Sequence, residues 1–162
     1  INGQIDAWLP VNEAVGGDTA FIIPNTDTTL TIPSTSERVI TVGAYDSANI
    51  STVGFSGRGY TRATEYIKPD LVAPGVNILT TTVGESITSF TGTSAAAPFV
   101  AGSAALLMEW GIVDRNDIFL YGERLKAFLC NGAIRDNSRE YPNREWGYGR
   151  LCLKNTLDLL KK

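Results

Sequence analysis

The sequence has no histidine at all, and only two cysteines and one methionine among its 162 residues. Without histidine or a C-x-x-C pair, two cysteines do not make a zinc site, so we predict no metal and no cofactor. Charged residues are 19% of the chain with a net charge of −3, and the basic ones form no stripe. This composition argues against nucleic-acid binding. No apolar run approaches the roughly 20 residues that span a bilayer, so no membrane partner is expected.

The length of the chain and its hydrophobic content of 43% predict one globular domain with a real core. The chain opens on Ile1 rather than methionine and has no signal-like segment, so we expect an internal piece of a longer protein. Cys130 and Cys152 lie among apolar neighbours, which favours two buried free thiols. A disulfide between them is the alternative, and the redox compartment stays open.

Four stretches have the pattern of β-strands. The run "RVITVGAY" (38–45) is almost continuously apolar and β-branched, which predicts a strand buried on both faces. A second short apolar run is "DLVAPG" (70–75). The Thr-rich stretches "NILTTTV" (77–83) and "SITSFTG" (86–92), with glycine between them, predict a hairpin.

Three helices are expected after these strands. The Ala-rich stretch 94–110 is uncharged until Glu109, which predicts a buried helix closed by Gly111. Asp114 or Asn116 would cap the next helix, which ends at Asn131-Gly132 and shares one apolar face among Ile118, Tyr121, Leu125 and Phe128. A last helix over 153–161 would pack Leu153, Leu157 and Leu160 inward. Strands followed by helices predict a layered α/β fold.

The stretch around Ser94 carries the chemistry. Gly92 and Thr93 allow a tight turn from strand into helix, which places Ser94 where the first backbone amides lack partners. Such amides stabilise a developing oxyanion, an effect of about 3–4 kcal/mol per donor. Pro98, inside the helix, cannot donate to the carbonyl of Ser94, and such strained helix starts are common at functional sites. In the alternative interpretation Ser94 only caps a core helix.

A serine needs a neighbouring base, and this chain has no imidazole. The segment "GTSAAAPFVAG" resembles the nucleophile motif of the subtilisin-like serine proteases. The segments "VITVGAYDS", "FSGRG" and "KPDLVAPGVNILTT" resemble that family in the same order, so the resemblance covers roughly residues 33–110. It implies the C-terminal part of a subtilisin-like three-layer α/β/α fold with a mostly parallel sheet.

The resemblance also implies roles for single residues. Ser94 is the expected nucleophile, with its own amide as one oxyanion donor. Gly92 and Thr93 lie beside the oxyanion hole, and Phe90 is a wall on the leaving-group side. In this family the triad order is Asp, His, Ser, so the Asp and His should lie on an upstream, N-terminal part. Subtilisin-like folds often bind cations through loop carbonyls, but the sequence places no such site.

Two positions depart from common family residues. Ala95 stands where many members have methionine, a conservative change that removes an oxidation-prone sulfur. Phe99 stands where secreted subtilisins usually have a histidine that is not the catalytic one. Neither departure removes a triad member.

A narrower resemblance is to the Csp proteases of clostridial spore germination. It rests on "AWLP", "DTTLTIPST", "LLMEWGI" and "YPNREWGYGRL" and reaches both ends of the chain. It implies a bacterial, spore-associated or extracellular protein in which residues 1–33 connect to an upstream β-rich insertion. Residues 34–162 would then be the C-terminal portion of the peptidase domain.

We therefore expect a serine endopeptidase that acts on protein or peptide substrates, and we expect this fragment alone to be inactive. The alternative is a pseudoprotease that acts as a binding or signalling partner in spore germination. A serine hydrolase of another fold is disfavoured, because the chain has no G-x-S-x-G or S-x-x-K motif. Among other residues, Asp70 is expected to pair with nearby backbone or Lys68, while Trp110, Trp146 and Tyr148 are expected to be anchors.

Overall fold

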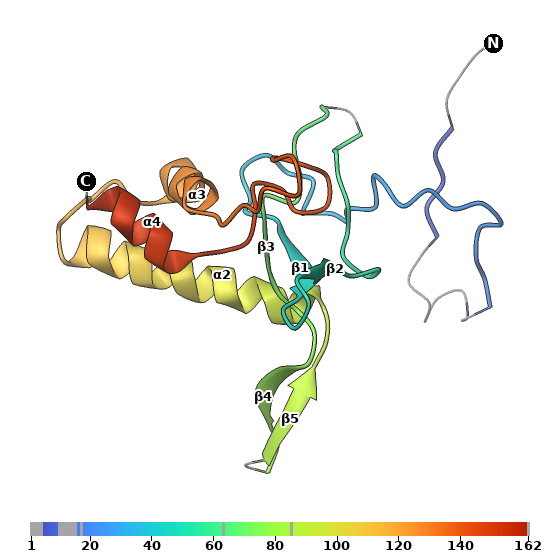
Figure 1. Cartoon of the computed structure of the whole chain (residues 1–162), viewed down its shortest axis with the longest axis horizontal. Helices are drawn as coiled ribbons and strands as arrows, with labels where there is room; N and C mark the ends of the chain where they lie inside the picture. Colours follow the sequence, from blue (N-terminus) through green and yellow to red (C-terminus); the bar gives the residue numbers. More distant parts are fainter. Residues whose placement is uncertain (1–4, 10–15, 17, 63, 85, 162) are drawn as a thin grey trace.

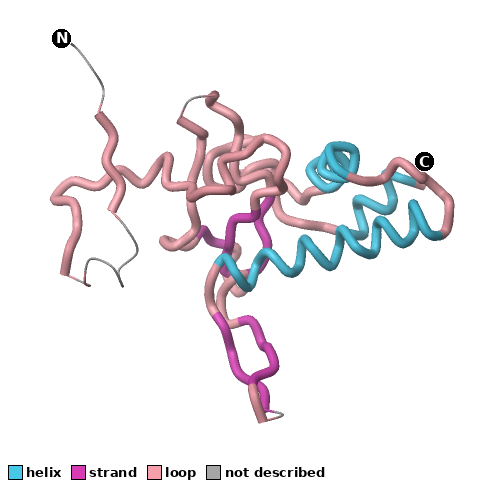
Figure 2. Tube along the Cα trace, turned by 180° about the vertical axis from the view of Figure 1, so that it is seen from behind, coloured by secondary structure: helices cyan, strands magenta, loops and turns pink. Residues whose placement is uncertain are grey.

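The computed structural model describes residues 5–9, 16, 18–62, 64–84 and 86–161. Within them, the segment before β1 contains no helix or strand (Figure 2). The elements in chain order are drawn in Figure 1: β1 (Val42–Asp46), β2 (Ser51–Thr52), β3 (Leu71–Pro74), β4 (Ile78–Thr82), β5 (Ser86–Phe90), α2 (Thr93–Met108), a π-helical turn η1 (Glu109–Val113), α3 (Gly122–Asn131) and α4 (Leu153–Leu160).

The central sheet is built on the parallel pair β1 and β3, which runs in register from Val42 opposite Leu71 to Tyr45 opposite Pro74. On the other side of β1, the short β2 pairs antiparallel, and only at the last two residues of β1. Side chains alternate across a strand. Ala44 therefore belongs to the core under α2. The next residue, Tyr45, lies on the opposite face of the sheet, and the centroid of its ring is 5.6 Å from that of Trp146. This mixed α/β arrangement agrees with the expected fold class.

The strand β1 is shorter than predicted, because it begins at Val42 rather than Arg38. The amide of Thr41 donates to the Asp70 carboxylate at 2.7 Å. A side chain therefore takes the hydrogen bond that a neighbouring strand would otherwise receive. The predicted strand at β3 and the predicted hairpin are both confirmed.

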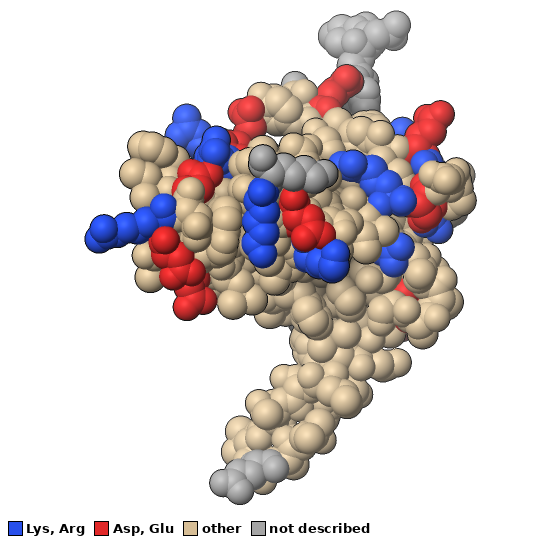
Figure 3. All heavy atoms as spheres, turned by 60° about the vertical axis from the view of Figure 1, so that its left-hand side comes forward, with Lys and Arg blue, Asp and Glu red and all other residues tan. Residues whose placement is uncertain are grey.

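The hairpin of β4 and β5 projects away from the body of the molecule (Figure 1). All its strand residues except Ile78 are exposed, including Leu79 and Ile87. Residues 76–84 and 86–93 contain no charged side chain, and in Figure 3 the described part of the projection shows none. The Lys, Arg, Asp and Glu side chains that Figure 3 colours lie on the body instead.

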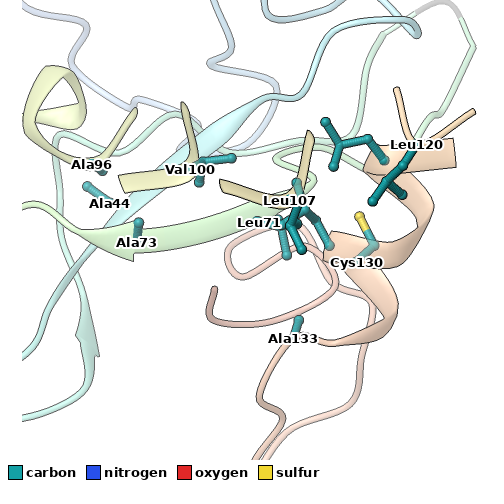
Figure 4. Packing of buried hydrophobic residues seen from close by; sticks show 11 residues of the cluster. Ala44, Leu71, Ala73, Ala96, Val100, Leu107, Leu120, Cys130 and Ala133 are labelled. Atoms are coloured by element: carbon teal, nitrogen blue, oxygen red, sulfur yellow. The ribbon is translucent and has the colours of Figure 1, made fainter. Parts of the chain in front are cut away.

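The helix α2 packs one side against the sheet. Ala96, Val100 and Leu107 are buried there with Ala44 and other members of the core cluster (Figure 4). Small side chains let the helix approach β1 and β3 closely. The helix predicted to be buried is buried only where it faces the sheet. The rest of the helix surface, which we call its outer side, is exposed and includes Phe99, Leu106 and Met108.

The end of α2 also differs from the prediction. The helix does not close at Gly111 but continues into η1, where the Asp114 amide donates to the Glu109 carbonyl at 3.0 Å. Together Thr93–Val113 form 21 residues with a mean hydropathy of 1.5, enough by length and composition to cross a bilayer. The expectation of no such apolar run is therefore wrong. A core helix passes the same test, and the absence of a membrane partner stays a prediction.

The helix α3 begins at Gly122, so neither Asp114 nor Asn116 caps it. The Asn116 side chain instead donates to the Trp110 carbonyl at 2.7 Å, which orders the loop after η1. The predicted end at Asn131 is confirmed.

The last helix, α4, is also confirmed, and its three leucines pack against the core. Both cysteines are free, as predicted. Cys130 is buried, whereas Cys152 is only half-buried.

Candidate functional site

Ser94 lies in the first turn of α2 and is exposed. The chain reaches it from β5 through Thr91 and Gly92, so a strand leads almost directly into the helix. Within the described part of the chain, no hydrogen bond occupies the Ser94 hydroxyl. The helix has no side-chain cap, so the interpretation of Ser94 as a simple N-cap is not supported.

The turn before Ser94 depends on two glycines that contact each other. The amide of Gly92 donates to the carbonyl of Gly75 at 2.8 Å, and Gly92 adopts φ 158° and ψ 166°, a region populated almost only by glycine. A Cβ on Gly75 would lie 2.6 Å from the Ala44 Cβ. The end of β3 and the Gly75 that follows it therefore support the start of the helix.

The backbone amides at this helix start are available to an acceptor. The amide of Ala95 is taken by the Gly92 carbonyl at 3.0 Å. The earlier amides, of Thr93 and Ser94, have no intrahelical acceptor, because the first amides of any helix lack one. They carry the positive end of the helix dipole, which suits an oxygen that gains negative charge.

Phe90 and Pro98 border the serine from the strand side and the helix side. Ring atoms of Phe90 lie 3.6 and 3.8 Å from where a Cβ on Gly92 would stand, so the ring flanks the turn. Pro98 lies inside α2, as predicted, and cannot donate to the Ser94 carbonyl. The structure thus brings Phe90, Gly92, Thr93 and Ser94 into one turn. Their roles in catalysis stay predictions.

A cleft of about 480 Å³ adjoins this turn. Thr93 is on its wall, together with residues from the segment 25–34 and the loop 54–58, with Val42 at the start of β1, and with Thr41 just before it. Val42 pairs with β3 on one side. On its other side none of the described strands pairs with it, because β2 reaches only Tyr45 and Asp46. The cleft therefore follows an open sheet edge up to the helix that bears Ser94.

The segment 25–34 is held in place by contacts that the sequence did not predict. Its Thr29 amide donates to the Arg58 carbonyl at 2.9 Å, and the Arg58 amide donates to the Thr29 hydroxyl at 3.0 Å. Asp27 forms an ion pair with Arg144 of the loop before Trp146. Pairs so far apart in sequence leave no local pattern from which they could be found.

The described residues contain no cluster of three or more His, Cys, Asp or Glu side chains that could hold a metal ion. A structural cation stays a prediction that the sequence does not place. The predicted pairing of Asp70 with Lys68 is confirmed, at 2.7 Å. Lys126 joins the same carboxylate at 3.0 Å, which the sequence analysis missed.

Comparison with known proteins agrees with these features. A sequence model described as the subtilase family matches residues 11–149. The serine protease AprX of Bacillus subtilis is 32% identical over 149 residues, which cover 80% of this chain and 32% of AprX.

Two solved structures are similar to this chain. The structure of the Clostridium perfringens CspB protease is 50% identical with a TM-score of 0.86, covering 89% of this chain and 31% of that one. The self-cleaved protease domain of PatA is 28% identical with a TM-score of 0.64, covering 85% of this chain and 47% of that one.

The chain therefore spans about a third of the length of AprX and of the CspB chain. The expected resemblance to subtilisin-like proteases, and to a Csp protease among them, is confirmed. With the family match over most of its length, the chain belongs to the subtilase family of serine proteases.

Proposed function

We propose that this chain supplies the nucleophile Ser94 of a serine endopeptidase that hydrolyses peptide bonds. The observation that carries the proposal is the exposed Ser94 hydroxyl at a helix start whose first amides have no intrahelical acceptor. Membership in the subtilase family supports the same reaction.

The base that activates Ser94 has to come from outside these 162 residues, because they contain no histidine. We infer that an N-terminal part of the same protease carries the histidine and the aspartate that orients it. The much greater length of AprX and CspB supports this inference.

In the reaction the Ser94 hydroxyl oxygen bonds to the peptide carbonyl carbon while its proton passes to the histidine. The carbonyl oxygen becomes negatively charged and accepts a hydrogen bond from the Ser94 amide, beside Gly92 and Thr93. The histidine then protonates the leaving amine, which departs past Phe90 and leaves an acyl group on Ser94. Water hydrolyses that ester, and Ser94 regains its proton.

Three neighbouring features support a docking place for the N-terminal part. The start of β1 offers an open sheet edge, and the cleft of about 480 Å³ beside it reaches Thr93. The outer side of α2, with Phe99 and Leu106, is apolar and exposed. A partner that adds a strand to β1 and covers α2 would end close to Ser94, where the histidine is needed.

A fluorophosphonate probe tests the proposal in the full-length protein. Wild type should be labelled at Ser94, and Ser94→Ala should abolish labelling and lower kcat for peptide cleavage by about a million-fold, the loss known for subtilisin itself. Ser89→Ala is the matched control, since Ser89 is an exposed serine of β5 and should leave both readouts unchanged. Labelling of Ser94→Ala at wild-type level would refute the assignment.

The second candidate is a pseudoprotease that binds a partner without cleaving it. The similarity to a Csp protease supports this alternative. A folded full-length protein that the probe does not label, and that cleaves no peptide, would establish this function in place of the first.

A further inference from the structure

Two lysines meet at one buried carboxylate beside the start of β3. The ammonium of Lys68 lies 2.7 Å from one Asp70 oxygen, and that of Lys126 lies 3.0 Å from the other. The side chains of Lys68 and Asp70 are 1% and 3% exposed, and that of Lys126 is 15% exposed. Two positive charges and one negative charge are thus largely removed from water.

Backbone carbonyls complete the surroundings of both ammonium groups. The Val39 carbonyl accepts from Lys68 at 2.9 Å and from Lys126 at 3.2 Å. The Glu37 carbonyl accepts from Lys126 at 2.7 Å. Asp70, Glu37 and Val39 therefore form what we name the oxygen cage, made of two carbonyls and one carboxylate. Carbonyl and carboxylate oxygens are the ligands that hard cations prefer in proteins.

The charge balance explains why the carbonyls are needed. One carboxylate neutralises only one of the two ammonium groups, and a buried charge is costly unless it is hydrogen-bonded. Burial lowers the pKa of Lys68, although Asp70 opposes that shift. For Lys126 burial is outweighed by the hydrogen bond and charge of Asp70, so its pKa is raised. Lys126 is thus held firmly as a cation in the cage.

We propose that the oxygen cage is a cation site whose cation is supplied by the chain itself, as the ammonium of Lys126 beside that of Lys68. The cage offers a carboxylate and two carbonyl oxygens, which are the ligands that hard cations prefer. A metal ion does not fit it, because two ammonium groups already stand at hydrogen-bond distance from its oxygens and would repel it. The two ammonium groups of the chain are therefore the cations that this cage holds.

The arrangement ties together three segments that are distant in sequence. Lys126 belongs to α3, Asp70 immediately precedes β3, and Val39 lies just before β1. A bound ion would join the same segments, but its effect would depend on the ion in solution. Because the lysines belong to the chain, the stability that this arrangement contributes does not depend on which salt is in solution.

Lys126→Ala tests the proposal, because it removes one ammonium and leaves the Glu37 carbonyl without its donor. Melting temperatures of the full-length protein are measured in ammonium, potassium, sodium and choline chloride at equal ionic strength. We expect the variant to melt at least about 2 °C higher in ammonium or potassium than in choline, beyond any difference shown by wild type. Subtracting wild type cancels cation sites elsewhere in the protein.

Lys154→Ala is the matched control, since Lys154 is an exposed lysine paired with Asp158 and should respond to salts as wild type does. Lys126→Met keeps the aliphatic stem without the charge, and it is measured in parallel so that lost packing does not prevent folding. A Lys126 variant that folds only in ammonium or potassium supports the proposal. Equal salt responses of wild type and both Lys126 variants would overturn it.

Discussion

The two sides of α2 have nearly the same composition but different surroundings. On the side facing the sheet, Leu107 is fully buried and Val100 is 3% exposed. Outside the face that meets the sheet, Leu106 is 55% exposed and Phe99 is 42% exposed. Leu106 and Leu107 are neighbours of the same residue type, so sequence alone gives no reason to treat them differently.

A helix that is apolar all round is typical of one buried on all sides. In this chain the sheet covers only one of them (Figure 1). The open edge of β1 begins on the same part of the molecule as the start of α2, since the cleft beside it reaches Thr93. The difference between the two sides therefore indicates that the exposed apolar side of α2, close to Ser94, is a surface on which another part of the protein packs.

The largest expected effect concerns residues 1–162 purified without any other part. They should show no peptidase activity, because the chain has no base for Ser94.

The same purified residues should also associate or aggregate, because the open β1 edge and the outer side of α2 remain uncovered. Sedimentation and calorimetry check the second outcome. A monomer that melts cooperatively would show that the outer side of α2 needs no cover.

The sequence predicted most elements, because their signals are local. The apolar run at β3, the Thr-rich hairpin and the three leucines of α4 need no knowledge of distant residues. The exposed side of α2 could not be predicted, because its neighbours decide which leucine is buried. Lys126 at Asp70 was missed for the same reason, since α3 and β3 meet only in the folded chain. For the site, the motif placed Ser94 at the helix start but gave no hint of Arg58 or the cleft.

The next effect in size comes from the neighbouring leucines in the full-length protein. Leu107→Ala should lower the free energy of unfolding by about 2–5 kcal/mol, because it opens a cavity in the core. If the N-terminal part covers the outer side of α2, Leu106→Ala should cost a similar amount. Denaturant unfolding measures both. A cost below about 0.5 kcal/mol for Leu106→Ala would mean that this side stays in solvent.

A smaller effect is expected for Gly75→Ala, because Gly75 is buried beside the turn that leads into α2. The added methyl group would stand 2.6 Å from the Ala44 Cβ and 3.0 Å from the Gly92 carbonyl oxygen. Overpacking of this kind costs about 1–3 kcal/mol and would displace the turn before Ser94. We expect kcat to fall more than KM rises, as measured by steady-state peptide cleavage. Wild-type kinetics and stability would show that the turn does not depend on this contact.

The smallest effect separates the two cysteines, of which only Cys130 is fully buried. Burial, assisted by the charge of Asp70, raises the pKa of the Cys130 thiol from 9.0 to about 12. Above pH 9 the unfolded chain then loses this proton while the folded chain keeps it. The contribution of Cys130 to the free energy of unfolding is therefore fully present below pH 9. It declines as the pH rises toward 12, by up to about 1.4 kcal/mol per pH unit.

Denaturant unfolding at pH 9 and pH 10 checks this slope. Cys130→Ala should be less stable at both values because of its cavity, but its stability should fall less between them than that of wild type. Cys152→Ala, which removes the other free thiol, is measured in parallel. Lys68, whose lowered pKa acts in the opposite direction, is present in all three proteins, so its contribution cancels in the comparison. An unchanged slope in Cys130→Ala would mean that this thiol reaches water more easily than its buried position on α3 indicates.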